Sequence, residues 1–199
     1  QRLKIIKTTP NQKNLIARFV KEVVKFNATH NITGRKLKED ILKSDVQDSQ
    51  TILTHTQNTN IILDIGSGAG FPGMIIAIHQ PNTHVVMSEK NNKKAYFIKK
   101  IIKLLNLQNA EIYDKAVGEN TTNLGPFDVI TARALAKTQK IISLSEHLLK
   151  QSGKFLLMKG TKEKVLNEVV QIDNKKYSYT IHNKNLKNLK RNILEINQK

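Results

Sequence analysis

The chain has no cysteine and no tryptophan among its 199 residues. Without cysteine it forms no disulfide and no thiolate metal site, and reactions that need a cysteine nucleophile are excluded. Its six histidines are not spaced as HxxxH or HExxH, so we expect no metal site. No apolar run approaches the ~18 residues of a membrane helix, and the polar first residues do not resemble a signal peptide. We therefore expect a cytoplasmic protein with no membrane partner.

Acidic residues are also few: 16 stand against 33 basic residues, a formal net charge of +17. A polyanionic partner explains this excess, because basic side chains release counterions from phosphates. A genome rich in A and T, which enriches Lys, Asn and Ile, is the alternative explanation. We favour RNA, with base stacking by Phe71 or Tyr96. The candidate phosphate-binding residues are Arg35, Lys36, Lys38, Lys93, Lys94, Lys99 and Lys100.

The first part of the chain is predicted to be helical. Residues 13–27 place apolar side chains on one helical face, and a second helical stretch covers about 36–54. The segment 27–34, NATHNITG, is typical of a loop. We interpret residues 1–58 as a helical N-terminal cap of a single domain.

Residues 59–199 alternate between strands and helices, which predicts an α/β, Rossmann-like core with a mostly parallel, seven-stranded sheet covered on both faces. The expected strands are 60–65, 84–89, 110–115, 126–132 and 153–160, and the expected helices are 71–80, 92–107, 138–150 and 161–172. Gly153 is expected to help end the third of these helices. Two last strands, 177–183 and 192–197, have no helix between them and predict an antiparallel edge hairpin.

The first strand of this core runs directly into the glycine-rich stretch DIGSGAGFPG, residues 64–73. A glycine turn at the carboxyl edge of a parallel sheet forms a ligand-binding crevice, because glycine permits positive φ and close approach to the backbone. The pattern GxGxxG at 68–73 alone would also suit the pyrophosphate of a nicotinamide dinucleotide.

The longer pattern, Asp64-x-Gly66-x-Gly68-x-Gly70, resembles motif I of the class I S-adenosylmethionine-dependent methyltransferases. An acid at Asp64 suits the methionine end of that cofactor, directly or through water. Glu89 follows the second strand, where a carboxylate can accept hydrogen bonds from both ribose hydroxyls. The nicotinamide alternative leaves Asp64 unexplained.

Several motifs together resemble one family, the bacterial small-subunit ribosomal RNA guanine-N7 methyltransferases, also known as glucose-inhibited division protein B. The resemblance covers almost the whole chain. The motifs are DIGSGAGFPG, EKNNKKAYFI (89–98), TARALA (131–136), MKG (158–160), NIT (31–33) and DS (48–49). It implies methylation of guanine N7 in the 530 loop of 16S rRNA, by in-line transfer from S-adenosylmethionine, with the RNA or the small ribosomal subunit as partner and a monomeric enzyme.

The resemblance also implies roles for particular residues. Gly66 and Phe71 match positions that contact the cofactor, and the backbone around Val117 and Gly118 matches the segment that holds the adenine. Arg133 matches an arginine beside the cofactor and the target base, and is the candidate catalytic residue. We expect it to position guanine O6, a phosphate or the cofactor.

The chain departs from the family pattern at three places that matter. The stretch Lys115–Glu119 lacks the family's usual Arg-Ala-Glu, and Asp45 stands where the family often has a histidine. Lys93 and Lys94 stand in place of the family's Lys-Arg, so bidentate phosphate contacts there are lost. Two alternatives therefore stay open: a methyltransferase with another RNA or protein substrate, and a catalytically inactive, cofactor-binding RNA assembly factor. Guanine N7 has no proton to remove, so the absence of an evident catalytic base agrees with the leading hypothesis.

Overall fold

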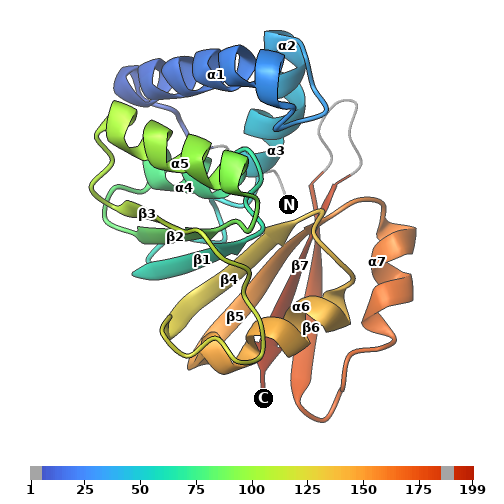
Figure 1. Cartoon of the computed structure of the whole chain (residues 1–199). Coiled ribbons are helices and arrows are strands. Elements are labelled where there is room, and N and C mark those ends of the chain that lie inside the picture. The colour runs from blue at the N-terminus through green and yellow to red at the C-terminus, as the bar shows by residue number, and fades with distance from the viewer. Residues whose placement is uncertain (1–5, 185–190) are drawn as a thin grey trace.

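The computed structural model describes residues 6–184 and 191–199. They form one seven-stranded sheet with helices packed against it (Figure 1). The strand order is β3-β2-β1-β4-β5-β7-β6. The strands are β1 (Ile61–Ile65), β2 (His84–Ser88), β3 (Ala110–Tyr113), β4 (Phe127–Arg133), β5 (Leu149–Lys159), β6 (Tyr177–Asn183) and β7 (Asn192–Gln198). The first five strands run parallel, and β7 lies antiparallel to both β5 and β6. The predicted fold class is therefore confirmed.

Helices cover both faces of this sheet, with α1, α4 and α5 on one face and α6 and α7 on the other (Figure 1). No helix in the described ranges is both long and apolar enough to cross a lipid bilayer. The helices are α1 (Pro10–His30), α2 (Lys38–Ile41), a π-helical turn (Leu42–Val46), α3 (Gln47–Gln50), α4 (Gly73–His79), α5 (Asn92–Leu105), α6 (Thr138–Ser145), a 3₁₀ turn (Glu146–Leu148) and α7 (Lys162–Val169).

Successive side chains of the central strands point to opposite faces of the sheet, and this produces two hydrophobic cores. Ile62 and Leu156 face the core beneath α1, α4 and α5, whereas Leu63 and Leu157 face the core beneath α6 and α7. All four side chains are fully buried. Strands with both faces buried explain why the central segments are continuous apolar runs in the sequence.

Helix α1 of the cap is longer than predicted and packs against the glycine turn. A capping box between Thr9 and Gln12 begins it, and Asn31, at φ +49°, ends it. The predicted loop at 27–34 is therefore wrong over its first four residues. The buried Phe19 of α1 packs its ring against that of Phe71, with centroids 5.0 Å apart.

Gly153 does not end a helix, which corrects the prediction. The helical segment stops at Leu148, and β5 begins at Leu149. A Cβ atom at Gly153 would lie 2.9 Å from the carbonyl oxygen of Phe127 and 2.8 Å from Cγ of Leu149. The glycine is needed for this close approach of neighbouring backbones rather than for a helix cap.

The direction in which strands are added reverses between β1 and β4, which are neighbours in the sheet. β2 and β3 extend from one side of this pair, and β5, β7 and β6 from the other. In open α/β sheets the connections at such a reversal diverge and leave a crevice at the carboxyl ends of the strands. The glycine turn after β1 and Arg133 at the end of β4 both lie at this edge.

We expect Phe19→Ala to lower the free energy of unfolding by about 3–5 kcal/mol, the usual cost of emptying a buried phenylalanine site. Chemical denaturation monitored by circular dichroism measures the change. The control is Leu166→Ala on α7, because Leu166 is 45% exposed and should cost far less. Equal losses in both variants would show that Phe19 does not anchor α1 to the turn.

Candidate active site

The turn between β1 and α4 has the backbone conformation that its glycines predicted. The φ angles are +70° at Gly66, +60° at Gly68 and +96° at Gly70, a region that residues with a Cβ rarely adopt. The amides of Gly66 and Ser67 both donate to the carbonyl oxygen of Ser88, at 2.8 and 3.0 Å. The turn is therefore fixed across the ends of β1 and β2.

Asp64 fixes the start of α4 by a hydrogen bond. Its side chain is fully buried, and its Oδ2 accepts a 2.9 Å hydrogen bond from the amide of Gly73. A Cβ at Gly73 would lie 2.8 Å from that oxygen, so no larger residue fits there. Burial raises the pKa of Asp64 to about 6, and the Gly73 hydrogen bond offsets only part of this effect. Oδ1 has no hydrogen-bond partner among the described residues.

Glu89 connects the turn to the segment after β2. One carboxylate oxygen accepts from the amide of Gly68 at 2.9 Å, and the other accepts from the amide of Asn91 at 2.8 Å. The side chain is largely buried. A carboxylate has about four acceptor positions, so both oxygens retain capacity for a ligand after making these contacts.

Val117 and Gly118 lie in the connection after β3. Val117 is buried in the core beneath α6 and α7. The amide of Gly118 donates to Oγ1 of Thr121 at 3.0 Å, and its carbonyl oxygen accepts from the amide of Thr121 at 2.9 Å. The backbone of Gly118 is thus already engaged within its own turn, and adenine binding there stays a prediction.

A cavity of about 660 Å³ opens at the carboxyl edge of the sheet. Of the candidate residues, its wall contains Gly66, Gly68, Phe71 and Arg133. The other candidates do not line this cavity: Asp64, Gly70, Glu89, Val117 and Gly118. The structure thus brings the glycine turn and the candidate catalytic arginine to one cavity.

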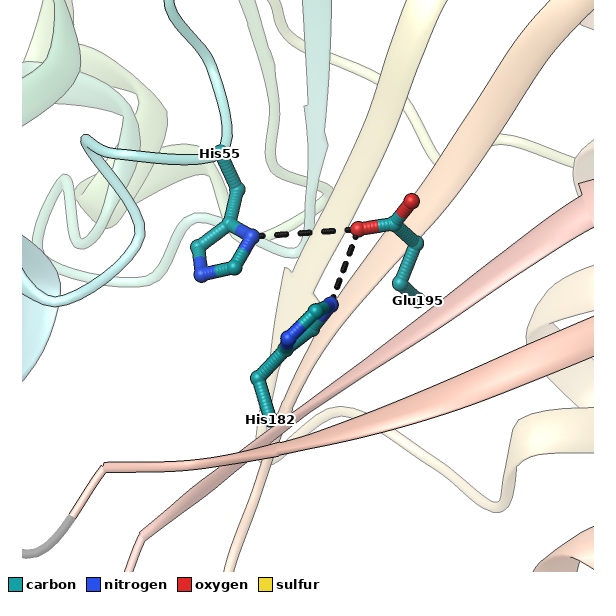
Figure 2. Close-up of side chains that lie close together, drawn as sticks. All are labelled: His55, His182 and Glu195. Carbon is teal, nitrogen blue, oxygen red and sulfur yellow. Dashed lines mark hydrogen bonds and ion pairs between the residues drawn. The ribbon is translucent and has the colours of Figure 1, made fainter. Parts of the chain in front are cut away.

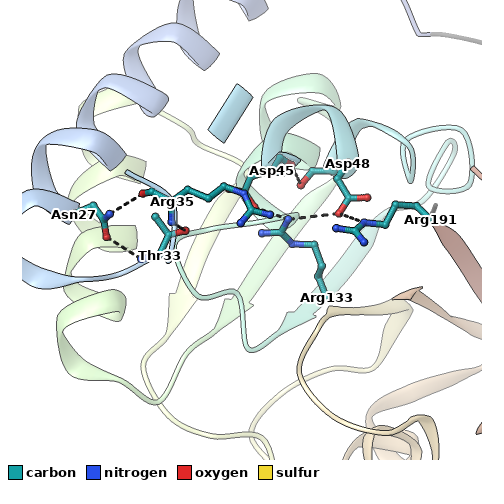
Figure 3. Close-up of polar contacts among 8 residues, drawn as sticks. Asn27, Thr33, Arg35, Asp45, Asp48, Arg133 and Arg191 are labelled. Atoms are coloured by element: carbon teal, nitrogen blue, oxygen red, sulfur yellow. Dashed lines mark hydrogen bonds and ion pairs between the residues drawn. The ribbon is translucent and has the colours of Figure 1, made fainter. Parts of the chain in front are cut away.

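Arg133 belongs to a chain of charged side chains on one side of this cavity (Figure 3). Its Nη1 donates to Asp45 at 2.7 Å and lies 3.6 Å from Asp48. Arg35 pairs with Asp45 and Arg191 with Asp48, each at 3.2 Å. Both acids are nearly inaccessible, whereas the three arginine side chains remain 20–33% exposed. The buried acids therefore hold partly exposed guanidinium groups against the cavity.

The charges of this cluster do not cancel, because three arginines face two acids. Burial raises the pKa of Asp48, although the pairing with Arg191 and Arg133 opposes that effect. The sequence indicated Arg35 only as a general basic residue and did not indicate Arg191. Arg191 is 143 positions from Asp48, so no local pattern could have revealed this contact.

Phe71 is not free to stack on a base, which corrects that expectation. Its ring is 2% exposed, with Phe19 on one side and the guanidinium carbon of Arg133 5.4 Å from its centroid. This stacking fixes Arg133 instead. Tyr96, the other aromatic residue suggested for stacking, is 63% exposed on α5.

The connection after β4 covers part of the glycine turn. Ala134 has a φ of +53°, and a Cβ built on Gly66 would lie 2.6 Å from Cδ1 of Leu135. Lys159, at the end of β5, donates to Glu168 at 2.7 Å and to the carbonyl oxygen of Ala136 at 3.1 Å. These contacts fasten the connection to β5 and α7, beside the cavity.

The amino-acid sequence matches a family model described as rRNA small subunit methyltransferase G (GidB) over residues 12–197. A ribosomal RNA small subunit methyltransferase G of Nitrosomonas eutropha is 35% identical over 148 residues, which are 73% of this chain and 68% of that protein. A protein of the same name from Helicobacter hepaticus is 36% identical over 145 residues, 72% of this chain and 78% of that one.

The fold is also found in solved structures of low sequence identity. The O-methyltransferase from Bacillus cereus, solved in complex with SAH, is 17% identical. It aligns with a TM-score of 0.65 over 92% of this chain and 91% of its own. At this identity the likeness concerns the fold alone, and it agrees with the class I methyltransferase architecture.

Asp64→Asn should remove a specific pH dependence of stability. The folded-state pKa of about 6 lies above the ordinary value of 3.8, so Asp64 imposes no cost at lower pH and an increasing cost as the pH rises through 6. Between pH 4 and 8 the unfolding free energy of the wild type should therefore fall relative to Asp64→Asn, by up to about 3 kcal/mol.

Urea denaturation at each pH measures this difference, with Asp40→Asn, which removes an exposed carboxylate of α2, as the control. A constant difference between the wild type and Asp64→Asn across this range would contradict the raised pKa.

Proposed function

This chain belongs to the family of rRNA small subunit methyltransferase G, and on that basis we propose that it methylates N7 of a guanine in the 530 loop of 16S rRNA, with S-adenosylmethionine as the methyl donor. The observation that carries the proposal is the meeting of the glycine turn and Arg133 in the wall of one cavity. The net charge of +17 supports an RNA partner. We further propose that the enzyme works as a monomer in the cytoplasm.

The residues at the turn fit the cofactor. Gly66 and Gly68 present backbone without side chains to the cavity, and Glu89 has acceptor capacity for ribose hydroxyls. Asp64 has one buried oxygen that no residue in the described part of the chain contacts by a hydrogen bond. This oxygen suits a positively charged methionine amino group reached directly or through water. The backbone near Val117 and Gly118 would hold the adenine. When bound, S-adenosylmethionine supplies a methyl group already activated on a sulfonium.

The protein must then orient the base and exclude water, because the N7 lone pair attacks without prior loss of a proton. Arginine commonly binds guanine through O6 and N7 together, but a donor on N7 would occupy the lone pair that reacts. We assign Arg133 a contact to O6 or to a phosphate instead. Its bond to Asp45 and its contact with Phe71 fix the guanidinium for this role.

The RNA must deliver its base unpaired, since a base within a helix cannot reach the methyl donor. The partly exposed guanidinium groups of Arg35, Arg133 and Arg191 border the cavity. They lie where phosphates next to an extruded nucleotide would pass, and arginine pairs well with phosphate.

Methyl transfer from radiolabelled S-adenosylmethionine to 16S rRNA without modifications tests the proposal, with the labelled nucleoside identified by mass spectrometry. We expect 7-methylguanosine at one position. Label in a different nucleoside or in protein would instead support another substrate. Bound cofactor without transfer to any ribosomal substrate would support an inactive assembly factor.

Arg133→Ala should leave the fold intact, because Arg35 and Arg191 still pair with Asp45 and Asp48. Turnover should fall by about 100-fold or more, as expected when a base loses its fixed orientation. Single-turnover methyl transfer measures the effect, and Arg18→Ala is the control, because Arg18 binds the carbonyl of Leu104 outside the cavity. Unchanged turnover would remove Arg133 from the active site.

Gly68→Val should abolish binding of S-adenosylmethionine, measured by isothermal titration calorimetry. A β-branched residue is strained at a φ of +60° and would occupy the cavity side of the turn. Gly34→Val is the matched control, because an added Cβ there meets no atom within 4 Å and Gly34 does not line the cavity. Wild-type affinity in Gly68→Val would refute the assignment of the turn to the cofactor.

A further inference from the structure

Two histidines and a glutamate meet at a second place in the fold, between the cap and the C-terminal hairpin (Figure 2). His55 follows α3, His182 lies in β6 and Glu195 in β7. Nδ1 of His55 and Nε2 of His182 lie 3.7 and 3.0 Å from the same glutamate oxygen, Oε2. The three ligand atoms are all within 4.8 Å of one another.

His55 lacks the hydrogen bonds that a buried imidazole normally makes. Its side chain is only 14% exposed, yet neither ring nitrogen makes a hydrogen bond to any residue in the described ranges, and Nε2 is fully enclosed. The 3.7 Å separation from Glu195 is too long for a hydrogen bond. Nδ1 thus faces Glu195 without a hydrogen bond to it, and its lone pair is available for a ligand.

We propose that His55, His182 and Glu195 bind Zn²⁺, with water completing the coordination. Ligand atoms at about 2.1 Å from a tetrahedral zinc ion lie roughly 3.4 Å apart. The two histidine–glutamate separations, 3.0 and 3.7 Å, bracket this value. The two histidine nitrogens lie within 4.8 Å of each other, so rotations of the side chains would bring all three ligand atoms to this spacing. Two imidazoles and one carboxylate are a ligand set that zinc accepts in proteins.

The charges around these three residues affect their affinity for the zinc ion. The positive charge of Lys184 acts on His55, and an imidazole binds metal in its neutral form. Lys154 lies 3.5 Å from the other glutamate oxygen, Oε1, and leaves Oε2 to the histidines. Both lysines repel a cation, so removal of the Lys154 charge should tighten binding.

The position of the cluster suggests what the ion would do. It would join the segment after α3 to the β6–β7 hairpin. The Asp48–Arg191 ion pair makes a neighbouring connection, from α3 itself to the residue that precedes β7. None of the three ligands lies in the cavity wall. Zinc would therefore stabilise the docking of the hairpin against the cap, and this inference does not depend on methyl transfer.

Titration of the chelator-treated full chain with ZnCl₂, by calorimetry and by thermal unfolding, tests the site. We expect one ion per chain and a rise in Tm, because a ligand that binds only the folded state stabilises it. His182→Ala and Glu195→Gln should weaken binding at least about tenfold, and Lys154→Met should strengthen it. The control is His84→Ala, which removes the exposed pair between His84 and Glu111 and should bind zinc as the wild type does.

The proposal is overturned if the wild type binds no zinc, or if His182→Ala and Glu195→Gln bind it with unchanged affinity, since the ion would then lie elsewhere. Circular dichroism shows whether each variant is folded. Glu195→Gln keeps the size of the side chain, so weakened binding in a folded Glu195→Gln protein supports the site even if His182→Ala unfolds.

Discussion

The glycine turn between β1 and α4 is the constraint on which the active site depends, and two carboxylates hold it. Asp64 binds the amide of Gly73 from beneath, and Glu89 binds the amide of Gly68 from the side. Asp64 thus accepts a backbone donor at the start of α4, where negative charge is favourable, whereas Glu89 accepts a donor within the turn itself. The same two acids are the ones proposed to serve the cofactor, so the groups that shape the turn would also form part of the proposed binding site.

The burial of Asp64 illustrates a conflict between stability and function. This buried carboxylate has a pKa of about 6, and one of its oxygens has no hydrogen-bond partner within residues 6–184 and 191–199. Such a group costs free energy in the absence of a ligand. A cationic ligand group that reaches this oxygen would relieve the cost. Such local strain is typical of sites whose geometry is set before the ligand arrives.

Buried acids also fix the functional groups on the other side of the cavity. The large excess of basic residues could have left Arg133 mobile in solvent, but the buried Asp45 and Asp48 fix it together with Arg35 and Arg191. Because two acids face three arginines, the cluster keeps a net positive charge for an anionic substrate. Of the two acids, Asp45 makes the shorter contact to Arg133.

The sequence by itself determined the parts of this protein that depend on neighbours in the chain. The alternation of strand and helix segments predicted the sheet, and two last strands with no helix between them predicted its hairpin. Closely spaced glycines predicted a turn with positive φ beside an acid, because backbone geometry is set within a few residues. Prediction from the sequence failed where the deciding contact joins residues that are far apart in the chain. Gly153 was misread because the backbone of Phe127, and not a helix end, requires it. Phe71 was expected to be open to a base but lies beneath Arg133. Only the tertiary structure placed Arg191 on Asp48 and His55 beside His182, since pairing of buried charges and imidazoles depends on which surfaces the fold encloses together.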